Sequence, residues 1–413
     1  MENWFFAAGD LGFFWNEQLR AFHWLPQVFD QSHGLGFSRI FSLWLDYPFR
    51  LLMKILSGAG LSWWLIEKML WLSVFGLAIY SSKKLAEYVL GKTSFSWLSA
   101  VVYAANTYIF LLFGGGQLGV AWAYAFVPFI LGKFFAAIDS AKNITLKTSV
   151  RNGLWIALLV VFDLRFAYLA ALIIGLYALY RRRVPLLSFI TSLVCALGIH
   201  VFWILPLLLA GSGNGLSEEF TGSGMLRFLS VADFSHAFSL LHPNWPDNLF
   251  GKVYFLQPEF LLLPVIAFAS LLVRKGKVHF YALLALVGAF FAKGVQEPFG
   301  AVYEWLFRYV PGFFMFRDAT KFYLFVAVAY SILIPFVLQH AVKKVPRFAW
   351  IMMCGFVLLW AVSVRPLFTG SLSGNFRPTQ LPSEYVQLKN ILLADTAPSR
   401  TLWIPQRENY AYS

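Results

Sequence analysis

Long apolar stretches separated by short basic segments constrain the fold of this chain more than any other feature. A helix needs about 20 consecutive apolar residues to cross the hydrocarbon core of a bilayer. Only 13% of the residues are charged, far below the roughly one quarter found in soluble proteins. The sequence therefore predicts an all-α polytopic membrane protein with about eight to ten transmembrane or half-spanning helices. The predicted spans are 63–80, 96–113, 119–137, 152–180, 185–209, 259–273, 278–293, 321–340 and 348–364.

The basic segments predict an orientation, because cytoplasmic loops of membrane proteins carry an excess of Lys and Arg. With residue 1 outside, every basic loop falls on the cytoplasmic side, namely 83–92, 142–151, 181–183, 274–277 and 343–347. These loops also explain the net charge of +13, so nucleic acid is not expected as a partner.

Three regions follow from this topology. Residues 1–62 are expected to form an extracytoplasmic loop with interfacial helices, and residues 63–365 a transmembrane domain with outer loops 211–258 and 294–320. Residues 366–413 are expected to begin an extracytoplasmic C-terminal domain that is truncated here, because 382–413 has the pattern of a helix and a strand. No span carries the N-terminus outward. Either a preceding helix is missing from this sequence or the interfacial helices translocate unaided, and we favour the missing helix.

The apolar stretch 152–180 is interrupted by Asp163-Leu164-Arg165. Each flank is short for crossing a hydrocarbon core of about 30 Å. The pattern therefore favours a helical hairpin with Asp163 and Arg165 at its tip. A pair between these two side chains is the simpler interpretation of the charges, and substrate binding is the alternative.

The stretch 294–325 places charged residues at the start of an apolar span. Val310-Pro311-Gly312 should break any helix, and Arg317, Asp318 and Lys321 follow a Phe-rich run. Charges beside membrane sequence are costly unless they meet a partner, an aqueous cavity or an anionic ligand. We therefore predict a cavity for an anion, with Arg317 and Lys321 as phosphate-binding residues. The alternative is a salt bridge with Asp318 and snorkelling to the interface.

Short motifs for nucleotide-driven or metalloprotease chemistry are absent, since the sequence has no Walker loop, HExxH, GxSxG, CxxC or DxD. No metal site is predicted either, because His236 and His242 lack carboxylates at ligand spacing. A carboxylate just outside the membrane could act as a general base, and Asp10, after Gly9, is the candidate. A helix N-cap is its alternative role.

Several short segments along the chain form a recognisable set. They are Gly9-Asp10, Asn106, Gly114-Gly115-Gly116-Gln117, Leu241-His242-Pro243-Asn244-Trp245-Pro246, Lys293-Gly294, Pro298-Phe299-Gly300, Pro311-Gly312-Phe313, Phe316-Arg317-Asp318 and Lys321-Phe322. Together they resemble the GT-C superfamily of integral-membrane glycosyltransferases and, within it, bacterial arabinofuranosyltransferase-like and YfhO-like proteins. The resemblance extends over nearly the whole chain, and its last block is the most specific. It implies a GT-C-like fold, a polyprenyl-phosphate-linked sugar donor, and transfer to an acceptor hydroxyl outside the cytoplasm.

The expected function is therefore sugar transfer to an extracytoplasmic glycan or lipid-linked acceptor, at a bacterial or archaeal cytoplasmic membrane. Asp10 would deprotonate the acceptor hydroxyl, and cationic side chains would bind the donor phosphate. Membrane lipids are further partners, and neither a metal nor another cofactor is expected. The expected substrate-binding residues are Arg317, Lys321, Asp318, Asp163, Arg165 and His242.

Two other classes of function stay open at this point. A polyprenyl-lipid or polysaccharide transporter or flippase would also hold charges beside broken helices, but it should place them near the middle of the membrane. A non-catalytic membrane scaffold would need no charged cavity at all. Convergence of Asp10 and Arg317 on one outward cavity with an opening toward the lipid would favour the enzyme.

Overall fold

The computed structural model describes residues 10–30, 37–40, 42–140, 144–209, 223–245, 258–273, 276–369 and 380–394. Within these ranges the regular elements are helices, apart from two short antiparallel strands, β1 (Phe29–Asp30) and β2 (Phe37–Ser38). Five helical segments are long and apolar enough to cross a membrane, or up to seven if each of two bent helix pairs forms one span. The predicted all-α membrane class is thereby confirmed.

The helices that could span the membrane alternate with breaks at polar or small residues. The long segments are α3 (Trp63–Leu90), α6 (Leu118–Asp139), α8 (Leu164–Arg181), Ala319–Lys344, which contains η5 (Ala319–Phe322) and α17 (Tyr323–Lys344), and Pro346–Ser363, which contains η6 (Pro346–Phe348) and α18 (Ala349–Ser363). The bent pairs are α4 (Ser96–Ala104) with α5 (Thr107–Gly114), at 42°, and α9 (Leu186–Ile199) with α10 (Val201–Leu209), at 75°. The predicted span over 185–209 is present as a pair of helices, and the chain bends by 75° between them, at His200.

Helix α17 forms the centre of the bundle. Within the span Ala319–Lys344, 94% of the 18-residue apolar window is buried, whereas only 17% of the corresponding window of Pro346–Ser363 is buried. A helix that is apolar on all sides belongs either in a core or against lipid. The packing of α17 against α3, α4, α15 (Gly276–Ala292) and α18 assigns it to the core and leaves α18 at the periphery.

The predicted hairpin over 152–180 is present as α7 (Leu146–Phe162) and α8, with Asp163 between them. The end of α7 lies beside the start of α6, where a side chain on Gly119 would come within 2.8 Å of the Phe162 carbonyl oxygen. The end of α8 lies beside the end of α6, where Arg181 Nε is 2.7 Å from Asp139 Oδ1. The two helices therefore run in opposite directions along α6.

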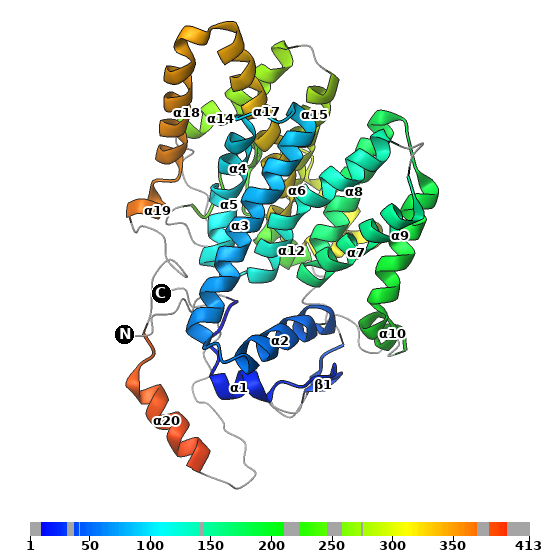
Figure 1. Ribbon diagram of the computed structural model, residues 1–413, viewed down its shortest axis with the longest axis vertical. Helices are drawn as coiled ribbons and strands as arrows, with labels where there is room; N and C mark the ends of the chain where they lie inside the picture. Colours follow the sequence, from blue (N-terminus) through cyan, green and yellow to red (C-terminus); the bar gives the residue numbers. More distant parts are fainter. Residues whose placement is uncertain are drawn as a thin grey trace.

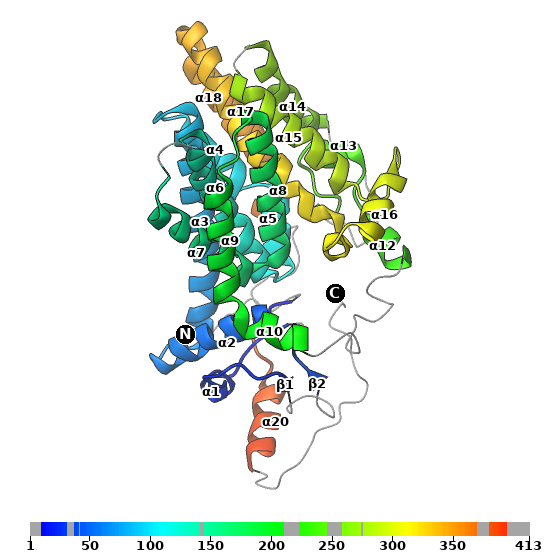
Figure 2. The same ribbon diagram turned by 90° about the vertical axis from the view of Figure 1, so that its right-hand side faces the viewer.

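The N-terminal helices α1 (Asn16–Ala21) and α2 (Leu43–Gly58) lie together with α10 at one end of the bundle (Figures 1 and 2). The α3–α4, α8–α9 and α17–α18 connections lie toward the opposite end (Figure 1). These connections belong to the predicted basic loops. Charged loops and N-terminal helices therefore mark opposite ends of the molecule.

Several shorter elements lie in segments that were predicted as loops between the spans. Helix α16 ends at Tyr309, and Gly312 has a φ of +78°, so the predicted break at 310–312 is confirmed. Helix α20 supplies the helix expected in 382–413, whereas the expected strand lies outside the described residues. The remaining elements are α12 (Ser223–Leu229), α13 (Phe234–Phe238), α14 (Pro258–Phe268), η3 (Ala269–Leu272), α16 (Gly300–Tyr309), η4 (Phe313–Phe316), α19 (Pro366–Thr369) and α20 (Ser383–Ala394).

Candidate functional site

A cavity of about 580 Å³ lies between α2 and the adjoining ends of α6, α7 and α8. A largely apolar pocket with a few convergent polar groups is the usual form of a small-molecule site. The apolar lining includes Phe14, Trp44, Phe49, Trp122 and Phe162. The charged and amide side chains in the lining are Asp10, Asp46, Arg50, Gln117, Asp163 and Arg165.

Asp163 and Arg165 form a bidentate ion pair at the tip of the hairpin. Asp163 caps α8 by accepting a hydrogen bond from the Arg165 backbone N–H at 2.8 Å. The Arg165 side chain donates from Nε to Oδ1 at 3.0 Å and from Nη2 to Oδ2 at 2.6 Å. The predicted mutual pairing is confirmed, and within the described residues Arg165 Nη1 has no hydrogen-bond partner.

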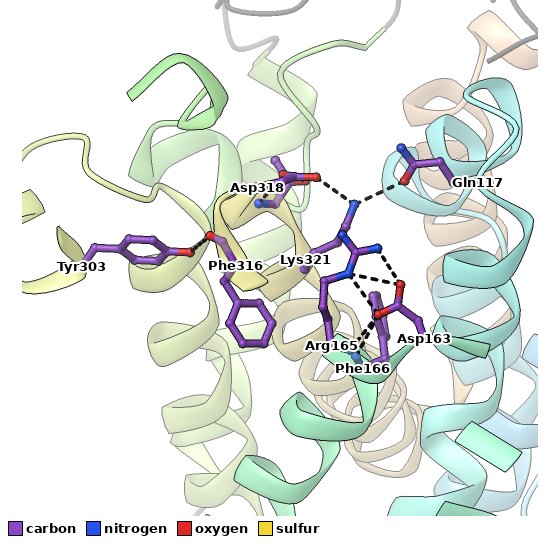
Figure 3. A network of polar contacts seen from close by, with 9 residues as sticks. Gln117, Asp163, Arg165, Phe166, Tyr303, Phe316, Asp318 and Lys321 are labelled. Atoms are coloured by element: carbon purple, nitrogen blue, oxygen red, sulfur yellow. Dashed lines mark hydrogen bonds and ion pairs between the residues drawn. The ribbon is translucent and has the colours of Figure 1, made fainter. Parts of the chain in front are cut away.

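Lys321 connects the start of the central span to the start of α6. Its Nζ donates to Asp318 Oδ2 at 2.8 Å and to Gln117 Oε1 at 3.3 Å, and its side chain is 3% exposed. Figure 3 shows the Lys321 ammonium between Asp318 and Gln117, next to the Arg165 guanidinium. Lys321 thus links segments that are 204 residues apart in the chain.

Asp318 has two roles in this arrangement. It caps η5 by accepting a hydrogen bond from the Thr320 N–H at 3.0 Å, and it pairs with Lys321. Burial raises the pKa of Asp318, but the charge of Lys321 and its hydrogen bond lower it by more, so the carboxyl pKa lies well below its ordinary value. Asp318 is therefore an ionised structural partner rather than a proton acceptor.

Asp10 reaches the same cavity from the N-terminal segment. Its backbone N–H donates to the Gly115 carbonyl at 2.9 Å, which holds it beside Gln117. Its carboxylate has no hydrogen-bond partner in the described part of the chain. Asp10 is exposed, but neighbouring protein atoms desolvate its carboxyl and raise its pKa above the ordinary value, against the opposing influence of Lys321 and Arg165. A raised pKa makes a carboxylate a stronger proton acceptor.

The alternative role of Asp10 as a helix N-cap is wrong. The first described helix, α1, begins at Asn16, and its N-cap is Trp15. Asp10 lies in a turn that precedes this helix. Its placement is therefore explained by the contact with Gly115 rather than by capping.

Four predicted substrate-binding residues do not line the cavity, as far as the described residues define it, namely Arg317, Asp318, Lys321 and His242. Asp10 and Arg317 therefore do not meet in this cavity. Arg317 is half-buried between η4 and η5. The His242 ring is buried, lies 6.1 Å from the Tyr108 ring, and accepts a hydrogen bond at Nδ1 from the Asn244 N–H at 3.2 Å. Burial lowers the pKa of His242 to about 4, so the ring is neutral and packs α5 against the loop that follows α13.

Sequence reasoning missed the contribution of α2 to the cavity. Asp46 Oδ1 accepts a hydrogen bond from Arg50 Nε at 2.8 Å, and Asp46 Oδ2 accepts one from Arg39 Nη1. The Asp46 and Arg50 spacing of four residues on an amphipathic stretch is a recognisable signal for such a pair. Gln117 also has a site position that was not predicted, although it belongs to the glycine-rich segment noted in the sequence.

Comparisons with known proteins identify no relative, because no family model, curated protein or solved structure matches the chain. The described residues also contain no group of three His, Cys, Asp or Glu side chains placed to hold a metal ion. The resemblance to GT-C enzymes therefore stays a prediction, and the chemistry of the cavity is the basis for any proposal about function.

Proposed function

We propose that this protein is a GT-C-type membrane glycosyltransferase that uses a polyprenyl-phosphate-linked sugar as donor. The main support is the placement of Asp10, Asp163 and Arg165 around one largely apolar cavity at the end of a membrane-type bundle. The Lys321–Asp318 pair does not line this cavity, but Lys321 contacts the lining residue Gln117. Apolar walls suit an isoprenoid chain, and the charged groups suit a phosphate and an acceptor hydroxyl.

The proposed reaction is a displacement at the anomeric carbon of the donor sugar. The acceptor oxygen forms a bond to this carbon as its proton passes to the Asp10 carboxylate. The bond between the carbon and the phosphate oxygen breaks, and the phosphate leaves with the electron pair. Cationic side chains at the cavity compensate the charge that develops on the leaving phosphate.

The proposed site faces the extracytoplasmic side of the membrane. The cavity lies at the end of the bundle that carries α2, opposite the connections that hold the basic loops (Figure 1). Basic loops prefer the cytoplasm. A glycan or lipid-linked acceptor would then meet a lipid-anchored donor at the outer surface of a bacterial or archaeal cytoplasmic membrane.

A transporter or flippase is less well supported by the position of the charges. Asp163 and Gln117 lie at the starts of α8 and α6, and Lys321 lies at the start of the central span. A transporter is expected to hold its coupling charges near the middle of broken spans. The end-on position favours chemistry at the membrane surface.

Transfer from a panel of polyprenyl-phosphate sugars to lipid-linked acceptors, with purified protein in nanodiscs, tests this proposal. We expect at least one donor to yield a glycosylated acceptor and free polyprenyl phosphate in equal amounts. Movement of a lipid-linked sugar between leaflets without any glycosylated product would support the transporter instead. Neither product nor movement with any donor would favour a scaffold.

A further inference from the structure

Arg50 on α2 is held in the cavity wall by contacts that leave the end of its guanidinium open. Its Nε donates to Asp46 Oδ1 at 2.8 Å, and its guanidinium carbon lies 4.9 Å from the centre of the Phe22 ring. Within the described residues, neither Nη1 nor Nη2 of Arg50 has a hydrogen-bond partner. The side chain is 31% exposed, so these donors are accessible from the cavity.

Asp46 is itself fixed from its other side. Its Oδ2 accepts a hydrogen bond from Arg39 Nη1, and Arg39 is buried. A carboxylate held between two guanidinium groups has little freedom to rotate, so it orients the Arg50 plane. An oriented side chain loses less entropy when it binds a ligand.

The other cations of the site have fewer donors left. Arg165 uses Nε and Nη2 on Asp163, which leaves Nη1 alone. Lys321 uses its ammonium on Asp318 and Gln117, and it is almost fully buried. Among the described residues that line the cavity, Arg50 therefore offers the open fork that matches two oxygen atoms of a phosphate.

We infer that Arg50, oriented by Asp46, is an anion-binding residue that takes the phosphate of a lipid whose apolar chain packs on the cavity wall. Trp44 and Phe49 lie on the same helix as Arg50 and line the same cavity, so the apolar and cationic groups are presented together. This inference rests on the proposed function, because it names the residue that recognises the lipid donor.

Binding of polyprenyl monophosphate to the protein in nanodiscs tests the inference without requiring transfer. Two comparison ligands separate the parts of this lipid. Polyprenol of the same chain length carries the isoprenoid chain without the phosphate, and inorganic phosphate carries the anion without the chain. Arg50→Gln should weaken binding of polyprenyl monophosphate about 10- to 100-fold, as expected for the loss of charged hydrogen bonds. Arg50→Lys should also weaken it, because an ammonium cannot supply the fork. Polyprenol binding should not change in either variant.

Lys54→Gln is the matched control, because Lys54 lies one turn further along α2 and donates to the Arg20 carbonyl outside the cavity lining. It should bind polyprenyl monophosphate like the wild type. Unchanged binding in Arg50→Gln would overturn the inference, as would an equal loss of polyprenol binding in that variant. Inorganic phosphate that binds as tightly as the lipid phosphate would also overturn it, because the occupant would then be a free anion.

The two proposals can fail separately. Binding of polyprenyl monophosphate that depends on Arg50, in a protein that transfers no sugar, would support the anion site and contradict the glycosyltransferase. Sugar transfer that is unchanged in Arg50→Gln would support the enzyme and contradict the role of Arg50.

Discussion

Asp318 and Lys321 form an ion pair whose two partners differ in exposure, so their replacement should have unequal costs. Removing one partner of a buried pair costs about 3–5 kcal/mol, because the other charge stays buried without compensation. The Lys321 side chain is 3% exposed and that of Asp318 is 28% exposed. Asp318→Asn leaves the buried ammonium with Gln117 Oε1 as its hydrogen-bond acceptor, so we expect a loss near the upper end of this range.

Lys321→Gln should cost less, about 3 kcal/mol or below, because the remaining carboxylate is reached by water. The Thr320 N–H at 3.0 Å also continues to stabilise it. The double variant removes both charges, so its cost should be smaller than the sum of the single costs by about 0.5–3 kcal/mol. The Lys321–Asp318 pair is the part of the predicted salt bridge with Asp318 that the structure shows.

Free energies of unfolding from denaturant titration in mixed micelles would measure this double-mutant cycle. Arg308→Gln is the control, because Arg308 and Glu304 form an exposed pair on α16, and it should cost less than about 1 kcal/mol. Equal costs for the two single variants, or strict additivity in the double variant, would refute the reasoning from burial.

Three further predictions concern pH, topology and packing. Because desolvation by neighbouring protein atoms raises the pKa of Asp10, the transfer rate should fall as pH drops through a value above the ordinary 3.8, and a rate profile with its acid limb at or below 3.8 would contradict the role of Asp10. In a variant without native cysteines, Lys344→Cys should react only with reagents applied from the cytoplasmic side, and labelling from outside would invert the topology. Gly153→Ala should destabilise by about 1–3 kcal/mol through overpacking, since its new carbon would lie 2.6 Å from the Ser192 carbonyl oxygen. Gly175→Ala has no atom within 4 Å and should stabilise by roughly 0.5–1 kcal/mol, so thermal unfolding of the two variants measures the packing of α7 on α9.

Local sequence signals were sufficient to predict those elements whose bounds depend on residues close to them in the chain. Charges in the middle of an apolar stretch indicated the hairpin at Asp163, because a single span would bury them in lipid. The Pro-Gly pair at 311–312 indicated the end of α16, because neither residue continues a helix. The apolar character of 321–340 indicated a span, and the structure adds that this span is the central one.

Contacts between distant segments could not be read from the sequence in the same way. The contact of Lys321 with Gln117 brings η5 to the start of α6, and no local sequence pattern specifies that contact. The bend of 75° at His200 was missed because the residues on both sides are equally apolar. The position of α2 over the cavity was missed for a different reason. The sequence of an amphipathic helix shows which of its faces is apolar, but it does not specify which surface of the protein that face covers.

The most direct test of the proposed mechanism is the transfer rate of Asp10→Asn with a donor that the wild type accepts. General bases contribute about 100-fold or more to such rates, and an amide cannot accept the hydroxyl proton. We therefore predict that Asp10→Asn loses at least 100-fold in transfer rate and binds polyprenyl monophosphate as the wild type does. Glu17→Gln is the control, because Glu17 lies on α1 and pairs with Lys389 outside the cavity. This control variant should transfer sugar at the wild-type rate. A rate for Asp10→Asn above about a tenth of the wild-type rate would contradict the role of Asp10 as the base.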